Sequence, residues 1–148
     1  MVKKILVATD GSSHAKKAVE FAADFASRYD ATVHLVHVVQ EARIPDELKE
    51  LFEVEHLEKP PKRAYMETVG KRIIEDAKKE LLSHGTKKIE PVLLVGDAPE
   101  EIVKFAKKEN IDVIIIGSQG FGKIKELLIG SVTHKVFHAA HCTCITVK

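Results

Sequence analysis

The fold is decided by residues 111–116, which read Ile-Asp-Val-Ile-Ile-Ile and are followed directly by Gly117 and Ser118. This run has the length of a strand, and its β-branched residues suit extended backbone. A continuous apolar run without alternating polar residues is typical of a central strand that is buried on both faces of a parallel sheet. We therefore expect an α/β protein with this strand inside its sheet.

Strands and helices alternate on both sides of this run. Further strands are predicted at residues 3–9, 32–39, 89–95 and 142–147. Apolar residues at helical spacing fill the intervals, with the last helix predicted at residues 131–140. This order predicts a three-layer α/β sandwich of Rossmann-like type, in which a five-stranded, mostly parallel sheet carries helices on both faces.

The chain of 148 residues is predicted to form one domain over residues 1–148. Residues 41–61 are highly charged and are expected to be a variable insertion or flap. Their apolar residues could fold over a ligand, meet a partner or close the domain's own core, and the sequence favours none of these. They are Ile44, Leu48, Leu51 and Phe52.

Composition argues against several classes of partner. The net charge is only +1, aromatic residues make up 5% and Trp is absent, so neither nucleic acid nor an anionic membrane is an expected partner. No apolar stretch reaches the roughly 18 residues that span a bilayer, and the N-terminus lacks a signal-peptide pattern. A cytoplasmic location is expected. Cys142 and Cys144 are expected to be reduced thiols.

The segment after the buried strand carries the chemistry. Gly117 and Gly120 are followed, nine residues later, by Gly130 and Ser131 at the start of the last predicted helix. Glycines allow the backbone to approach a phosphate closely, and the free amides at a helix N-terminus attract anions. The hydroxyls of Ser131 and Thr133 are candidate donors to phosphate oxygens. Lys123 and Lys125 could screen the negative charge of the phosphate. The alternative is a structural turn followed by an ordinary helix cap.

The loop after the first strand should lie beside this segment. In doubly wound sheets, ligands bind at the carboxyl ends of the strands where the winding direction reverses, and Asp10 follows the first strand. Asp10 is a candidate ligand-binding residue, but it could equally cap the first helix, as could Ser12 or Ser13. His14 could lie near the ligand, although a solvated helix position is the commoner role for such a residue.

The spacing Gly-x2-Gly-x9-Gly-Ser resembles the nucleotide-binding signature of the universal stress protein family, in its ATP-binding branch. Matching stretches run from end to end: KKILVATD at 3–10, LVHV at 35–38, GDAP at 96–99, EIV at 101–103, IIIGS at 114–118 and LIGSV at 128–132. The resemblance implies a fold like that of the adenine nucleotide alpha hydrolases. Those hydrolases carry signatures near the first loop that residues 9–12 (TDGS) do not match.

The resemblance also implies a function, a ligand and a site. It implies an ATP-binding regulatory or switch module of the stress response, with Mg or Mn bound through the phosphates of ATP. It also implies a homodimer that pairs the last strand, from Cys142 to Val147, although Thr143 departs from the family's usual Pro near this position. The implied nucleotide-binding residues are Ala8, Thr9, Asp10, Val38, Gly117, Ser118, Gly120, Gly130, Ser131, Val132 and Thr133.

Catalysis is not indicated by any motif, so we expect at most slow ATP hydrolysis and assign no catalytic residue. A slow ATP hydrolase or phosphotransferase and a ligand-independent structural dimer remain as alternatives. His134 and His138 share a helix face and precede His141, Cys142 and Cys144, but the spacing fits no standard zinc cluster. We therefore expect these histidines to face solvent or the core rather than a metal.

Overall fold

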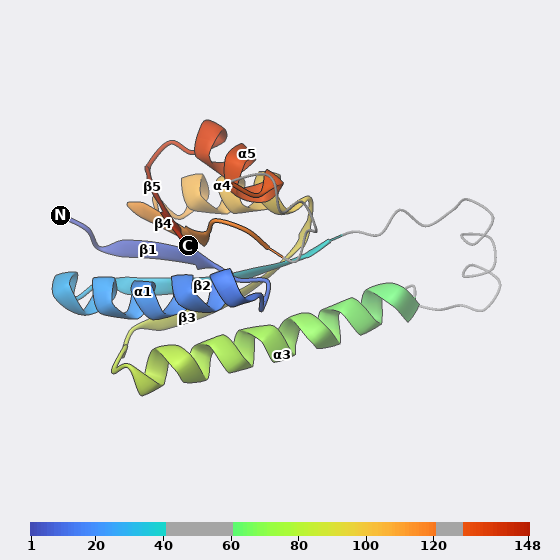
Figure 1. The fold of residues 1–148 in the computed structure, drawn as a ribbon, viewed down its shortest axis with the longest axis horizontal. Helices are drawn as coiled ribbons and strands as arrows, with labels where there is room; N and C mark the ends of the chain where they lie inside the picture. The colour runs from blue at the N-terminus through green and yellow to red at the C-terminus, as the bar shows by residue number, and fades with distance from the viewer. Residues whose placement is uncertain (41–60, 121–128) are drawn as a thin grey trace.

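The computed structural model describes residues 1–40, 61–120 and 129–148. Its five strands form one sheet in the order β3-β2-β1-β4-β5, and every neighbouring pair is parallel (Figure 1). The expected flap at residues 41–61 lies outside the described residues except for its last position, where a helix begins. The strands are β1 (Lys4–Ala8), β2 (Thr32–Gln40), β3 (Ile89–Gly96), β4 (Val113–Gly117) and β5 (Thr143–Val147).

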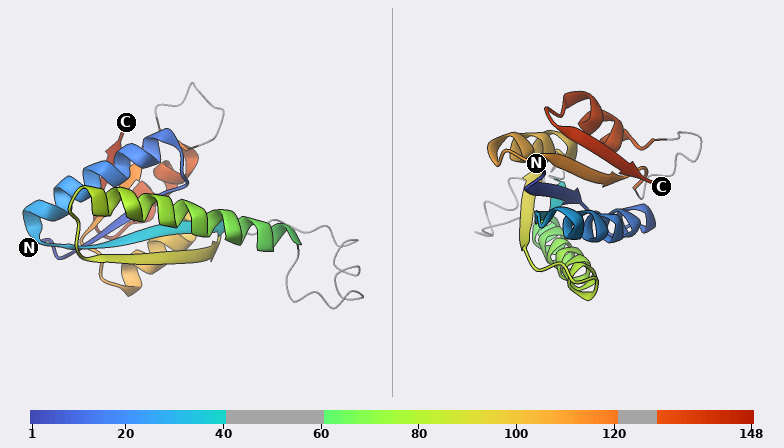
Figure 2. Two further views of the ribbon diagram at one scale, coloured as in Figure 1. Left: turned by 90° about the horizontal axis from the view of Figure 1, so that it is seen from below. Right: turned by 90° about the vertical axis from the view of Figure 1, so that its left-hand side faces the viewer.

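Helices cover both faces of the sheet, which confirms the three-layer α/β fold. Helices α1 (Ser13–Tyr29) and α3 (Pro61–Ser83) lie on one face, and α4 (Ala98–Lys108) and α5 (Ser131–Ala139) lie on the other (Figure 2). No helix within the described ranges is long and apolar enough to cross a membrane.

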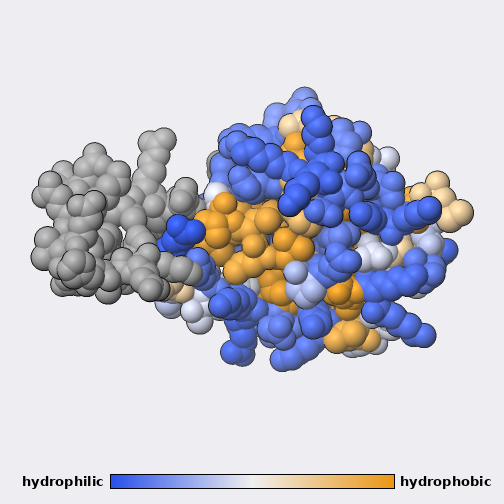
Figure 3. All heavy atoms as spheres, turned by 180° about the vertical axis from the view of Figure 1, so that it is seen from behind, coloured by the Kyte–Doolittle hydropathy of each residue, from blue (hydrophilic) through white to orange (hydrophobic). Residues whose placement is uncertain are grey.

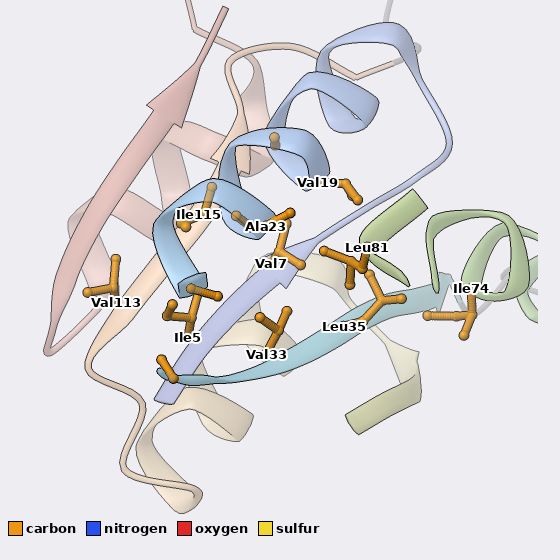
Figure 4. Close-up of a cluster of buried hydrophobic side chains, with 14 residues drawn as sticks. Ile5, Val7, Val19, Ala23, Val33, Leu35, Ile74, Leu81, Val113 and Ile115 are labelled. Atoms are coloured by element: carbon orange, nitrogen blue, oxygen red, sulfur yellow. The ribbon is translucent and has the colours of Figure 1, made fainter. Parts of the chain in front are cut away.

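Successive side chains of a strand point to opposite faces of the sheet, so the protein has one apolar core on each face. Ile5 and Val7 of β1 face α1 and α3, whereas Leu6 and Ala8 face α4 and α5. Figure 4 shows the first of these cores, in which side chains from α1 and α3 meet those of the central strands. All five residues of β4 are buried, as its unbroken apolar sequence predicts.

Strand β4 begins at Val113, two residues later than the sequence suggests. Asp112 ends the preceding turn, because its carboxylate accepts hydrogen bonds from the backbone N–H groups of Lys3 and Lys4 at 2.8 and 2.9 Å. These bonds hold the pKa of Asp112 below its usual value. The residue that looked like part of the strand therefore fixes the start of β1 beside β4.

Helix α3 packs directly on β2 and β3 because Gly70 has no side chain. A Cβ atom at Gly70 would lie 2.9 Å from His37 Cδ2, closer than real Cβ contacts, and 3.0 Å from Leu93 Cδ1, which is tighter than most of them. The expected stop near Gly85 is also confirmed: Gly85 has a φ of 84°, and its N–H donates to Leu82 O at 3.0 Å.

His34 of β2 is a buried polar residue in the α4 core. Its side chain is 3% exposed, and its ring packs edge-on against Phe105 with the centroids 5.8 Å apart. Nδ1 lies 3.2 Å from Glu90 Oε2, but neither ring nitrogen makes a hydrogen bond within the described residues. Burial lowers the pKa of His34 despite the opposing effect of the Glu90 carboxylate. His37 bonds the Thr9 carbonyl below α3, so the two histidines lie on opposite faces, as their spacing predicts.

This environment predicts a pH-dependent stability. Because the pKa of His34 is lower in the folded state, the unfolded chain binds its proton more readily, and stability is lost as the pH falls below about 6.5. His34→Gln should flatten this part of the profile. The free energy of unfolding of both proteins in urea, at pH 7.5 and at pH 5, measures the effect. Because both proteins contain all the other histidines, the difference between them reports on His34. Equal losses in the two proteins would contradict the assignment.

Candidate functional site

The winding of the sheet reverses between β1 and β4. The chain runs outward from β1 to β2 and β3, then returns to place β4 and β5 on the other side of β1. Ligands of doubly wound folds bind in the crevice at this point, outside the carboxyl ends of the strands. The predicted site residues at the ends of β1 and β4 are therefore neighbours, since Ala8 pairs with Ile116.

Gly117 ends β4 against the first turn of α1. A Cβ atom here would lie 2.8 Å from His14 C and 2.9 Å from both His14 O and Ala15 N. These are backbone atoms and cannot move aside as a flexible side chain could. The missing side chain of Gly117 thus allows α1 to begin close to the end of β4.

Ser118 joins four segments of the chain at the base of the crevice. Its N–H donates to Val147 O of β5 at 2.7 Å, and its carbonyl accepts from Gly130 N at 2.6 Å. Its hydroxyl lies 2.8 Å from Nδ1 of His14, and the residue is 1% exposed. The Ser118 hydroxyl therefore faces α1 within the protein, and the residue holds the entrance of α5 in place.

The loop after β1 brings Asp10 against Gly120. Asp10 Oδ1 accepts a hydrogen bond from Ser12 N at 2.9 Å, and a Cβ atom at Gly120 would lie 2.5 Å from Asp10 Oδ2. Asp10 does not cap α1, because Ser12 holds that position and accepts from Ala15 N at 3.3 Å. The carboxylate of Asp10 is thus directed across the crevice to the loop after β4.

Helix α5 begins without a side-chain cap in the described part of the chain. Gly130 is its N-cap residue, and the first helical bond is the one from His134 N to Gly130 O at 2.9 Å. The N–H groups of Ser131, Val132 and Thr133 precede that bond and have no partner inside the helix. Such a set of amides attracts an anion, and the helix dipole adds to the attraction.

Gly130 lies against the loop that carries Gly120. A Cβ atom at Gly130 would contact Gln119 Cα at 3.4 Å and Gly120 N at 3.7 Å, which are ordinary separations. The start of α5 therefore adjoins the loop that carries Gly120, and Gly120 in turn lies against Asp10. The two glycine clusters and Asp10, which the sequence placed in one site, are together in space.

The Thr133 hydroxyl donates its hydrogen bond inside the protein, to the backbone of Gly117. Thr133 is 3% exposed, and its Oγ1 donates to Gly117 O at 2.7 Å. Its suggested role as a hydroxyl donor to phosphate is therefore wrong, because its only hydroxyl proton already holds the end of β4. Ser131 is exposed, and its hydroxyl remains a candidate donor. Lys123 and Lys125 lie outside the described residues.

Val38 presents backbone groups beyond the end of β1. Thr9 N donates to Val36 O at 2.9 Å and Val33 N donates to Lys88 O at 2.8 Å, so alternate residues of β2 face β1 and β3. Val38 follows Val36 by two positions and directs its N–H and C=O to the side of β1, which ends at Ala8. These groups lie at an edge where the ladder has ended.

An apolar area adjoins this edge on the α4 side of the sheet. Val38 pairs in register with Leu94 of β3, and Leu94, Val92 and Val103 are only half-buried there. Figure 3 shows an apolar area among charged side chains on this side of the molecule. The backbone groups of Val38 thus lie next to an apolar surface, a combination that suits a flat heteroaromatic ring.

Two histidines hydrogen-bond to residues of this site; the sequence suggested His14 as a neighbour of the ligand but did not assign His37 to the site. His14 bonds the Ser118 hydroxyl, and His37 Nδ1 lies 2.7 Å from Thr9 O. Because a carbonyl only accepts, Nδ1 of His37 carries the proton. For His14 the signal was its place one turn after Asp10, whereas nothing in the sequence linked His37 to Thr9.

The described residues include no group of three side chains that could hold a metal ion. His134, His138, His141, Cys142 and Cys144 therefore do not converge on a zinc cluster. Both cysteines are free thiols, as expected. Burial raises the pKa of Cys142, and burial together with Cys142 raises the pKa of Cys144 to about 11, so neither is an activated nucleophile at neutral pH.

The parallel sheet and the reversal of its winding between β1 and β4 define a doubly wound, Rossmann-like α/β protein. The family model described as "Universal stress protein family" matches residues 1–148, and the chain belongs to this family. The relative MJ0577 of Methanocaldococcus jannaschii is 35% identical over 159 residues, which cover 100% of this chain and 96% of the relative.

Solved structures share the fold over nearly the whole chain. The structure of MJ0577 matches with a TM-score of 0.80 and covers 100% of this chain and 96% of its own. UspA of Lactobacillus plantarum matches with a TM-score of 0.84 at 22% identity and covers 99% and 97%. The universal stress protein of Archaeoglobus fulgidus, solved in complex with dAMP, matches with a TM-score of 0.67 at 24% identity and covers 100% and 98%.

The two glycines at the ends of this site should respond differently to alanine. Gly117→Ala forces a methyl group into the α1 backbone and should lower the free energy of unfolding by about 1–3 kcal/mol. Gly130→Ala meets only ordinary contacts and should cost less than about 1 kcal/mol, as a change of N-cap residue does. Urea unfolding measures the free energy of unfolding of both variants and of the parent. A larger loss for Gly130→Ala would contradict the packing described here.

Proposed function

We propose that this protein binds an adenine nucleotide, with ATP as the expected ligand, at the crevice between β1 and β4. The observation that carries the proposal is the start of α5, which has no side-chain cap among the described residues and where the amides of Ser131, Val132 and Thr133 adjoin the loop of Gly120. A polyphosphate bound there would satisfy these donors. The dAMP complex of the Archaeoglobus relative, which has the same fold, supports an adenine nucleotide as the ligand class.

The remaining residues have roles that follow from their chemistry. Asp10 is negative and would repel a phosphate, so its carboxylate suits a ribose hydroxyl, which donates a hydrogen bond to it. Ala8 and Thr9 end β1 beside it. The backbone edge at Val38 suits the hydrogen-bonding edge of adenine, and the apolar area next to it suits the ring. Gly117 and Ser118 shape the crevice rather than donate side chains to it.

A divalent cation would be held mainly by the nucleotide. Mg or Mn prefers oxygen ligands, and phosphate oxygens supply them. The described residues offer no cluster of three ligands for such an ion. The cation would reduce the charge of the phosphates near Asp10.

We further propose that binding serves regulation rather than turnover, with nucleotide occupancy read by a partner or by the dimer in the stress response. His14 Nδ1 is engaged with the Ser118 hydroxyl, so this nitrogen is not free to act as a general base toward a bound nucleotide. Phosphate-release assays distinguish this proposal from a slow ATP hydrolase or phosphotransferase. Turnover near one per second would favour the enzyme.

The homodimer is proposed to form at β5, which is an edge strand of the sheet. Phe21, Phe25 and Tyr29 form an aromatic ladder on α1, with ring centroids 6.0 and 4.9 Å apart, and Phe25 packs against the same core cluster as Ile145 and Val147 of β5. Phe21 and Tyr29 are 39% and 44% exposed. A second copy at β5 would cover apolar surface beside the strand.

Nucleotide binding should depend on the free amides of α5. Gly130→Asp places a carboxylate at the N-cap, where it would accept hydrogen bonds from these amides and repel phosphate. We expect it to abolish ATP binding in calorimetry while the free energy of unfolding stays equal or rises. Gly130→Ala leaves the amides free and should retain binding. Unchanged binding by the Asp variant, or no binding by the parent at millimolar ATP, would refute the site.

The proposed dimer should depend on the outward N–H groups of β5. Val147 faces β4, because its carbonyl accepts from Ser118 N, so Thr146 directs its N–H to the free edge. Thr146→Pro removes that donor without breaking the ladder with β4, and it should shift the protein to monomer in analytical ultracentrifugation. Thr146→Val keeps the donor and should remain dimeric. A dimer that tolerates proline would lie elsewhere.

A further inference from the structure

Helix α5 carries two exposed histidines one helical turn apart. Nε2 of His134 lies 3.2 Å from Nε2 of His138. The ring centroids are 4.5 Å apart, and the ring planes meet at 61°. The two side chains therefore direct the same ring nitrogen to one point on the helix surface, rather than pointing apart into solvent.

This separation matches the spacing of two ligands on one metal ion. Zinc binds imidazole nitrogen at about 2.0–2.1 Å, so two nitrogens at a tetrahedral angle lie about 3.3–3.4 Å apart. The observed 3.2 Å differs from that value by only about 0.2 Å, within the tolerance for a plausible site. Two histidines at positions i and i+4 on one helix face are also the arrangement by which helices bind zinc.

We propose that His134 and His138 form a binding site for one divalent transition-metal ion of the class that imidazole prefers, such as Zn²⁺ or Ni²⁺. Both residues are exposed, and no third metal-ligating side chain joins them among the residues that the structure describes. Water therefore completes the coordination. The site uses neither the amides of α5 nor Asp10, so it is independent of the proposed nucleotide site.

The change on binding is small, which favours the site. Without metal, the close approach of the two nitrogens is a hydrogen bond, in which Nε2 of one ring carries a proton and Nε2 of the other accepts it. On binding, both Nε2 lone pairs turn to the metal, and the proton moves to Nδ1 of its own ring. Because the two nitrogens already lie 3.2 Å apart, binding needs little further movement of the rings.

The neighbouring cysteines belong to a different environment. Cys142 and Cys144 pack against the core on the α4 side of the sheet, and among the described residues they form no three-ligand group with the histidine pair. His141 is exposed and lies close in sequence to the pair, which makes it a matched control. Any binding that needs His141 or a thiol would therefore arise from another site.

The test is calorimetric titration of the untagged, full-length, reduced protein with NiCl₂ and with ZnCl₂. We expect one ion per chain, and His134→Gln and His138→Gln should each weaken binding by more than about tenfold. His141→Gln should bind as the parent does. Excess Mg²⁺ should not compete, because it prefers oxygen ligands.

Thermal unfolding provides a second measurement that also checks the variants. Without metal, the parent and both variants should melt alike, because the substituted positions are exposed. Ni²⁺ should raise the melting temperature of the parent and of His141→Gln only. No binding to the parent below about 1 mM metal, or equal binding in the parent and both variants, would overturn the proposal.

Discussion

The candidate site depends on the hydrogen bonds of Ser118. Its N–H holds the end of β5 through Val147 O, its carbonyl holds Gly130, and its hydroxyl meets His14 at the start of α1. Because the residue is buried, each of these bonds is made in an environment where an unpaired polar group costs about 1–3 kcal/mol. One residue thereby fixes the position of the α5 amides relative to both faces of the sheet.

The same arrangement connects the two parts of the proposed function. Val147 belongs to the edge strand where we place the dimer, and Gly130 opens the helix where we place the phosphates. Ser118 lies between them, with hydrogen bonds of 2.7 and 2.6 Å on its two sides. Backbone hydrogen bonds of Ser118 thus join the α5 entrance to the carboxyl end of β5.

Much of the fold could be predicted because it rests on local patterns. The unbroken apolar run of β4 and the alternation of strands with helices were sufficient for the layers and the parallel sheet. The hydrogen-bond partners of the side chains in the site were not predictable in this way. Thr133 was expected to donate to phosphate but donates to Gly117 O, and His37 was not connected to Thr9 at all. These pairs are distant in sequence and meet only when the strands are in register.

The sequence by itself determined which peptide groups are free: glycines at fixed spacing, a strand that ends at Gly117 and a helix that begins at Ser131. These follow from local backbone chemistry, which needs no knowledge of distant residues. Only the tertiary structure decided what those groups face. The order β3-β2-β1-β4-β5 sets β1 beside β4; the neighbourhood of Asp10 and the glycine loop was expected from the doubly wound pattern, but the contact of Asp10 with Gly120 and the position of Val38 beyond the end of β1 were not. Strand order is a property of long-range packing, and no local pattern encodes it.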